Sequence, residues 1–368
     1  PVEDRTDELA IKRLRLEQLR SKLGLDAILL CRTSNIAWAT AGARFHIAIS
    51  MEAGVGAVLF DADGFHLLTN NIEERRLLTE ELPPGDWHAE SRPWFEDWLG
   101  QAIQSRGVSR LGTDMPMAGA QLCATELASL RTPLLEPEID RFRTLGRETG
   151  AGLEVAARAV RRGDSEFEIA ARVSAELTAR SIDPVVVLVA TDRRIAEIRH
   201  PLPTHARVSE RAMLVTCGRR DGLIVSATRL VQLGPIPADL ARRHEACARV
   251  NAAFAAATRD GATAAEIFKS GAAAYAAEGF DGEWKLHHQG GAAGYETRDW
   301  FGTPTGDQTV IAPQAFAWNP SITGTKIEDT ILLTASGVEV LTATGTWPTI
   351  SATVGGLTLD CPAILELA

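Results

Sequence analysis

The sequence lacks the features of a membrane-spanning or disulfide-rich protein. No apolar run reaches the ~18 residues needed to cross a bilayer. The five cysteines are dispersed, odd in number and free of C-x-x-C spacing, which disfavours both a disulfide framework and a zinc site. The first residues, PVEDR, are polar and lack the apolar core of a signal peptide. These absences predict a cytoplasmic protein with reduced thiols.

The charge balance limits the class of partner. The formal net charge is −10 at pH 7, which argues against nucleic acid or an anionic membrane as the main partner. Apolar residues make up 45% of the chain and charged residues 23%, as in ordinary soluble globular proteins. With 368 residues, the chain is long enough to form two domains, each with its own core.

The first part of the chain alternates between helix and strand patterns. Leucines spaced between charges predict a helix over residues 8–22, and short apolar runs predict strands at 26–31, 55–60 and 65–69. The D-A-D-G sequence between the last two strands predicts a hairpin. A further helix is expected at 94–106. We therefore expect an α/β domain over residues 1–135, followed by a linker at 132–137, where two prolines suit neither a helix nor a central strand.

The second part contains an internal repeat. Residues 163–169 and 261–267 align without a gap, and both carry the S/T-x-x-E capping box ahead of an alanine-rich helix. Capping boxes are common and coincidence is one explanation, but the repeat favours a duplicated unit with Ser165 and Thr263 at equivalent helix starts. Apolar runs predict three strands to accompany these helices, at residues 184–190, 212–217 and 330–334. We expect a sheet with helices on one side, an α+β arrangement.

Two segments towards the carboxyl end match known signatures. Residues 287–299 read HHQGGAAGYETRD and residues 318–330 read WNPSITGTKIEDT. They resemble the signatures of the proline-peptidase/creatinase family, which includes aminopeptidase P, prolidase, creatinase and methionine aminopeptidase. The sequence RHPLPT at 199–204 is similar to the segment that supplies the family's first active-site histidine. The resemblance implies a creatinase-type α/β domain over 1–135, a pita-bread catalytic-type domain over 140–368, and a homodimer.

The resemblance also implies that most metal ligands of the family are replaced. The peptidases hold two metal ions with two aspartates, one histidine and two glutamates. The equivalent positions here are Thr216, Ser226, Gly291, Asn319 and, as the one retained carboxylate, Glu328. Neutral hydroxyl and amide groups are weak substitutes for carboxylates as ligands of divalent ions. We therefore expect no metal cofactor, and His288 replaces the lost histidine only if the local backbone has shifted.

The remaining polar side chains indicate a metal-free site. The segment with Arg298 resembles that of creatinase, which hydrolyses a C–N bond of a small carboxylated substrate without metal. Imidazole titrates closest to neutrality, so histidines are the acid/base candidates. A guanidinium pairs with a carboxylate through two parallel hydrogen bonds, although an internal ion pair of Arg298 with Asp299, Glu296 or Glu328 is an equally weighted alternative. The predicted catalytic residues are His200, His287 and Glu328, and the predicted substrate-binding residues are Arg298, His288, Tyr295, Asn319 and Trp318.

Three functions of different class remain open from the sequence. The first is a metal-independent hydrolase acting on a C–N bond of a small, carboxylated, amino-acid-like or peptide-like substrate. The second is an Xaa-Pro dipeptidase or aminopeptidase with an altered metal site such as His287, His288 and Glu328. The third is a non-catalytic relative that binds a peptide or protein, because a fold alone does not fix a function. Metal analysis and turnover assays separate these three.

Overall fold

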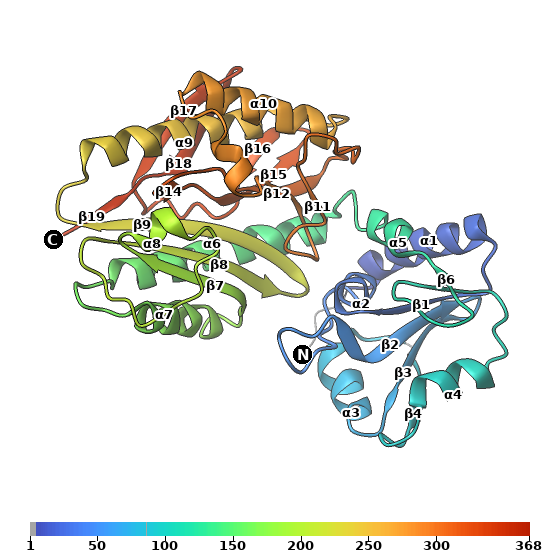
Figure 1. The fold of residues 1–368 in the computed structure, drawn as a ribbon. Coiled ribbons are helices and arrows are strands. Elements are labelled where there is room, and N and C mark those ends of the chain that lie inside the picture. The colour runs from blue at the N-terminus through green and yellow to red at the C-terminus, as the bar shows by residue number, and fades with distance from the viewer. Residues whose placement is uncertain (1–4, 86) are drawn as a thin grey trace. The chain divides into compact units, whose positions relative to one another are not determined.

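The computed structural model describes residues 5–85 and 87–368 (Figure 1). Residues 1–4, on which the signal-peptide prediction mostly depends, lie outside this range. Two compact units are present: residues up to Pro137 with Asp221–Leu223 form the first, and Glu138–Arg220 with Ile224–Ala368 form the second. Within the described residues, no helix combines the length and apolarity required for a membrane span.

The first unit is a six-stranded sheet with helices, in the order β4-β3-β2-β1-β5-β6. The predicted strands and the hairpin between β2 and β3 are confirmed. The predicted helix at 94–106 is too long, because Asp97 caps the amide of Gly100 and the helix begins at Trp98. The elements are α1 (Thr6–Leu23), β1 (Ala27–Arg32), α2 (Thr33–Ala39), β2 (Ala53–Asp61), β3 (Gly64–Asn70), α3 (Glu74–Arg76), η1 (Leu77–Glu81), β4 (His88–Arg92), α4 (Trp98–Ser105), β5 (Leu111–Thr113), β6 (Gln121–Leu122) and α5 (Ala124–Ser129).

The predicted linker at 132–137 ends earlier than expected. Helix α6 (Glu136–Arg158) begins at Glu136, so Pro137 lies inside its first turn. Proline is tolerated there because the first backbone amides of a helix have no partner within the helix. The prediction that Pro137 excludes a helix is therefore wrong.

The second unit contains two main sheets rather than one. The first has the order β19-β9-β8-β7 and the second β11-β10-β12-β15-β16. Figure 1 shows α6 and α7 on one side of this unit and α9 and α10 side by side on the other. The elements after α6 are α7 (Glu166–Thr178), β7 (Asp183–Thr191), α8 (Arg194–Glu197), β8 (Arg211–Arg220), β9 (Leu223–Leu233), α9 (Ala238–Ala257), α10 (Ala264–Ala277), η2 (Glu283–Leu286), β10 (Gly290–Ala293), β11 (Trp300–Phe301), β12 (Gln314–Trp318), β13 (Ser321–Ile322), β14 (Thr325–Lys326), β15 (Asp329–Thr334), β16 (Gly337–Val340), β17 (Thr349–Val354), β18 (Leu357–Pro362) and β19 (Leu365–Leu367).

These sheets confirm the α+β class, but the three predicted strands belong to two sheets instead of one. Strands 184–190 and 212–217 of the prediction are β7 and β8, which pair antiparallel in the first sheet. Strand 330–334 is β15, which pairs with β12 in the second sheet. The apolar runs located the strands correctly, but hydrophobicity alone does not say which sheet a strand joins.

The two capping boxes occupy equivalent positions. Ser165 caps α7 and Thr263 caps α10, each with the reciprocal bond from its glutamate. The chain before each helix also pairs in the same way with a later segment. The amide of Gly163 donates to the carbonyl of Val208, and the amide of Gly261 donates to that of Val310. Since both the caps and their backbone partners repeat, the second unit is built from two related halves, as the sequence predicts.

We predict that Ser165→Ala and Thr263→Ala each lower the free energy of unfolding by about 1 kcal/mol, because each leaves helix-terminal amides without a partner. Chemical denaturation measures the change. Ser174→Ala is the matched control, since its hydroxyl bonds only the carbonyl of Ala170 within α7 and its loss is expected to be nearly neutral. Cap variants no less stable than the control would contradict the assignment.

Candidate functional site

A cavity of about 260 Å³ lies in the second unit and collects residues from distant parts of the sequence. One wall is apolar and comes from β7, β8 and β11. The polar side is built from the loop after α8 and from the segments around β10, β12 and β14. The lining residues are Val186, Leu188, His200, Val215, Cys217, His288, Thr297, Arg298, Phe301, Asn319, Lys326 and Glu328. Five of the eight predicted site residues are therefore together here: His200, His288, Arg298, Asn319 and Glu328.

The carboxylate of Glu328 is held by two cations. Its Oε1 is 2.9 Å from Nη2 of Arg298, and its Oε2 is 2.8 Å from Nζ of Lys326. The hydroxyl of Thr228 donates a further hydrogen bond to Oε2 at 2.8 Å. All three charged side chains are buried. The internal ion pair between Arg298 and Glu328 is thus present, and both oxygens of Glu328 are occupied.

These contacts fix the charge of the site. Burial by itself would raise the pKa of Glu328, but Lys326 and Arg298 outweigh it and lower that pKa from 4.5 to about 2. Glu328 is therefore ionised at neutral pH. Two cations face one anion, so this group carries one net positive charge next to the cavity.

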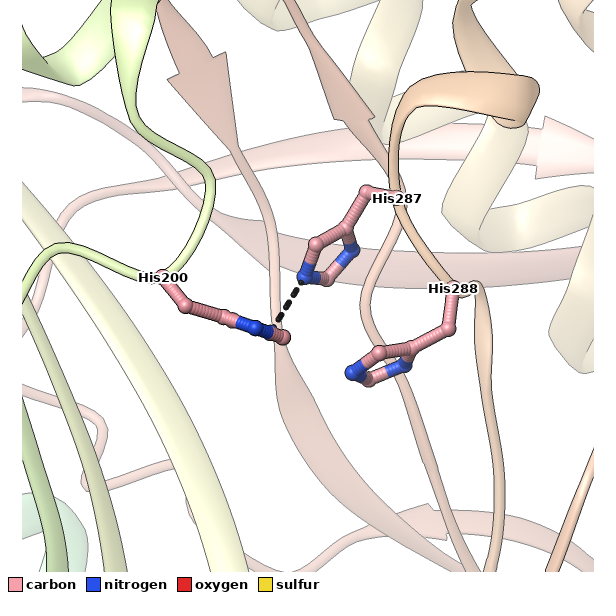
Figure 2. Close-up of side chains that lie close together, drawn as sticks. All are labelled: His200, His287 and His288. Atoms are coloured by element: carbon pink, nitrogen blue, oxygen red, sulfur yellow. Dashed lines mark hydrogen bonds between the residues drawn. The ribbon is translucent and has the colours of Figure 1, made fainter.

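Three histidines gather at the same cavity (Figure 2). His200 comes from the loop after α8, and His287 and His288 precede β10. Nε2 of His287 lies 3.0 Å from Nε2 of His200, and the ring of His288 stacks on that of His287 with 4.3 Å between centroids. His287 is buried, whereas His200 and His288 are exposed. His287 does not line the cavity itself, but it contacts the rings of His200 and His288, which do.

All three imidazoles are neutral at neutral pH. Burial and the charge of Lys326 lower the pKa of His287 to about 2. Burial, followed by the charges of Arg298 and Lys326, lowers the pKa of His288 to about 4. Burial and Lys326 also lower the pKa of His200. In the close pair, one neutral ring donates its N–H to the lone pair of the other.

Several buried polar atoms around the cavity have no hydrogen-bond partner within the described part of the chain. They are Oδ1 of Asn319, Nε of Arg298 and Nδ1 of His287. A buried polar atom without a partner loses its interactions with water and gains nothing in return. Asn319 and Arg298 both line the cavity, so a polar ligand there can satisfy them.

Two predicted site residues have other roles. The hydroxyl of Tyr295 donates to Glu138 on α6 at 2.6 Å, away from the cavity. The indole N–H of Trp318 donates to Thr258, and its ring stacks between Phe254 and Phe316 in the core. This cavity gives neither side chain a place in substrate binding.

The structure changes the interpretation of two former ligand positions. Thr216 points away from the cavity and donates to the carbonyl of Val186, while its neighbour Cys217 faces the cavity next to Ser226. Burial raises the pKa of the Cys217 thiol, so it remains protonated. At Gly291, a Cβ atom would overlap the carbonyl of Trp300 on β11. A histidine at that position does not fit this backbone.

Sequence reasoning missed Lys326, although it lies in a quoted signature. In extended chain, residues two apart point to the same face, so Lys326 and Glu328 share one. That spacing was a usable signal. The apolar wall of Val186, Leu188 and Val215 gave no such signal, because apolar strand residues are ordinarily core.

A second buried network of ion pairs and hydrogen bonds lies next to Glu328 and is centred on Arg229. Arg229 follows Thr228 on β9 and pairs with Asp329, the residue after Glu328, at 2.9 Å. Arg229 also pairs with Glu154 on α6, and Thr342 donates to Asp329. Thr228 and Arg229 therefore bind Glu328 and Asp329 respectively, which fixes β9 against the start of β15.

Comparisons with solved structures show the fold. A prolidase from Pyrococcus horikoshii OT3 shares 18% identity with a TM-score of 0.76, covering 90% of this chain and 98% of that one. An Xaa-Pro dipeptidase from Bacillus anthracis shares 16% identity with a TM-score of 0.73, covering 98% of this chain and 100% of that one. The N-terminal domain of FACT complex subunit SPT16 from Cicer arietinum shares 13% identity with a TM-score of 0.68, covering 92% of this chain and 97% of that one. The chain thus has the pita-bread architecture that these proteins share.

Sequence comparisons identify the family. No curated protein matches the chain significantly in sequence. The profile of the creatinase/prolidase N-terminal domain matches residues 12–144, and that of metallopeptidase family M24 matches residues 140–335. The second match spans more than half of the chain. The resemblance to the proline-peptidase/creatinase family is therefore confirmed, and the chain belongs to metallopeptidase family M24.

Proposed function

We propose that the cavity binds a small carboxylated molecule, amino-acid-like or peptide-like, and that the protein hydrolyses a C–N bond in it without a metal ion. The observation that carries this proposal is the excess positive charge of Arg298 and Lys326 over Glu328. A net positive, largely desolvated site favours an anionic ligand.

The family name implies metal ions, but these residues do not fit a carboxylate-bound pair. The one carboxylate that remains, Glu328, already has both oxygens bound to side-chain cations. Of the other positions that the resemblance aligns with metal ligands, Thr216 and Ser226 offer neutral hydroxyls, Asn319 offers a neutral amide and Gly291 has no side chain. Two divalent ions would have to displace both cations and keep a single charged ligand, which does not offset the loss of their hydration. No step of the reaction is therefore assigned to such a pair.

The polar lining suits a carboxylate. Arg298 has a planar fork of donors, and its Nε has no partner in the described structure. The ammonium of Lys326 lines the same cavity. Both oxygens of Glu328 already bind side-chain cations, so in this proposal Glu328 orients the two cations rather than binding a substrate nitrogen. A cavity of about 260 Å³ holds roughly nine water molecules at ~30 Å³ each, which suits a dipeptide or an acylated amino acid.

His200 is the proposed proton carrier. Its ring is exposed to the cavity, and the buried ring of His287 holds it through the 3.0 Å contact. A neutral imidazole takes a proton from the attacking water as the C–O bond forms. It then returns that proton to the nitrogen as the C–N bond breaks, so the atoms and charges balance. The hydrogen bond from His287 orients the ring of His200 and holds that ring in one tautomer.

The structural neighbours agree with this substrate class. Their names describe a prolidase and an Xaa-Pro dipeptidase. An Xaa-Pro dipeptide carries a free carboxylate and an amide C–N bond, the two features that the proposal requires. Binding without catalysis is the second candidate. The pairing of Glu328 with Arg298 and Lys326 favours it, because this carboxylate is already engaged by side chains of the protein itself.

Arg298→Met tests the carboxylate site. Removing the guanidinium takes away one charged hydrogen-bond partner of a buried carboxylate, so the free energy of unfolding should fall by about 2 kcal/mol. The affinity for N-acetylproline, measured by calorimetry, should fall in parallel. Arg143→Met is the control, because it breaks an exposed pair with Glu339 and should cost less than ~1 kcal/mol. Unchanged affinity in Arg298→Met would remove the carboxylate-binding role.

His200→Ala tests the proton carrier. Across a panel of N-acyl, ureido and guanidino acids and dipeptides, any substrate that is turned over should lose about 10²–10⁴-fold in kcat while KM changes little. EDTA should leave the wild-type rate unchanged. His205→Ala, an exposed histidine of the same loop, is the matched control. Loss of the rate in EDTA would reject metal independence, and absence of turnover across the panel would favour the binding function.

A further inference from the structure

The three-histidine cluster has a property that the proposed hydrolysis does not use. One ring nitrogen each from His200, His287 and His288 lies within 4.8 Å of the other two. Figure 2 shows the three rings converging from two separate segments of the chain. Among the described residues, no other group of three or more histidine, cysteine or acidic side chains is gathered in this way.

We propose that His200, His287 and His288 bind a single transition-metal ion of the Zn²⁺ class at this cavity. The ligands are three imidazole nitrogens, and the fourth position is left to water or to an anion. The site is separate from the carboxylate-based ligand set of the family. It does not depend on the proposed hydrolysis.

The geometry is close to what such an ion requires. A tetrahedral ion with Zn–N bonds of ~2.0–2.1 Å holds its ligand nitrogens roughly 3.3 Å apart. Nε2 of His200 and Nε2 of His287 are 3.0 Å apart. The buried ring of His287 is a fixed anchor, whereas the exposed rings of His200 and His288 have room to turn. An adjustment of about 1–2 Å by His288 completes the set.

Two existing hydrogen bonds are given up on binding. The first joins Nε2 of His200 to Nε2 of His287 at 3.0 Å, and the ring that donates it must carry its proton on Nδ1 instead, so that both Nε2 lone pairs face the ion. In the second, the amide of Gly290 donates to Nδ1 of His288 at 3.3 Å, a long contact. If Nε2 of His288 binds the ion, Nδ1 must carry the proton and this bond is lost. The cost is small compared with a metal–imidazole bond.

The ligand type selects the class of metal. Neutral imidazole suits Zn²⁺, Ni²⁺ and Cu²⁺, while Mn²⁺ and Mg²⁺ prefer oxygen ligands. Lys326 and Arg298 repel a dication and Glu328 offsets only one of them, so we expect moderate rather than tight affinity. An ion on His200 also occupies the lone pair that proton transfer needs, so Zn²⁺ should inhibit turnover.

Calorimetric titration tests the site on the 368-residue chain first stripped with EDTA. Wild-type protein should bind one equivalent of Zn²⁺ and no Mn²⁺ at the same concentrations. His200→Gln and His288→Gln should each weaken Zn²⁺ binding at least tenfold. Both rings are exposed, so the variants should remain folded, which circular dichroism checks. His205→Gln, on the same loop, should bind Zn²⁺ like the wild type.

The outcomes separate this proposal from the hydrolytic one, because binding is measured without substrate. No Zn²⁺ binding, or equal binding by wild type and both cluster variants, overturns it. Mn²⁺ bound as tightly as Zn²⁺ also overturns it, because that preference belongs to oxygen ligands. Substitution with Co²⁺ adds a spectroscopic readout: visible absorption typical of a tetrahedral nitrogen site should appear in the wild type and be lost in His288→Gln.

Discussion

The rest of the site depends on the two ion pairs that one buried carboxylate makes with two cations. Each oxygen of Glu328 holds one positive side chain, Arg298 or Lys326, with the Thr228 hydroxyl as a third donor. A buried ion without such partners is expensive, because it loses its hydration and gains nothing in return. Removing Glu328 would leave both cations without their buried counter-ion, whereas removing one cation leaves Glu328 with a single charged partner. The arrangement of the cavity wall depends on that constraint.

The retained sequence motifs make structural sense in this light. Thr228 binds Glu328, and the next residue, Arg229, binds the next residue, Asp329. Two adjacent residues on β9 thus hold two adjacent residues at the start of β15 through four side chains. These contacts join β9 to the start of β15 beside the cavity without any metal ligand. The presence of the Thr228-Arg229 and Glu328-Asp329 pairs is therefore explained by their role in holding the fold together. By itself it is not evidence for metal chemistry.

The sequence predicted more of the fold than of the site, for identifiable reasons. Capping boxes and apolar runs are local patterns, so Ser165, Thr263 and most strands could be placed from them. Site residues depend on which face of a strand they occupy, and an error of one residue reverses the face. That is why Cys217 rather than Thr216 faces the cavity. Tyr295 and Trp318 lie within the signatures, but their side chains bond Glu138 and Thr258 outside the cavity lining, and a sequence pattern does not show on which side an aromatic ring packs.

The proposed function depends on a change in the charge of the cavity. The resemblance to the family implies that neutral groups such as Ser226 and Asn319 stand where carboxylates bind metal, and Arg298 and Lys326 add positive charge beside them. On this proposal the site attracts anions, and its imidazoles are the electron-pair donors. Those donors have two competing uses, proton transfer and coordination of a nitrogen-preferring metal, because a neutral His200 ring has only one basic lone pair for either. A bound metal ion and proton transfer by His200 therefore exclude each other, and the two proposals compete for one imidazole ring.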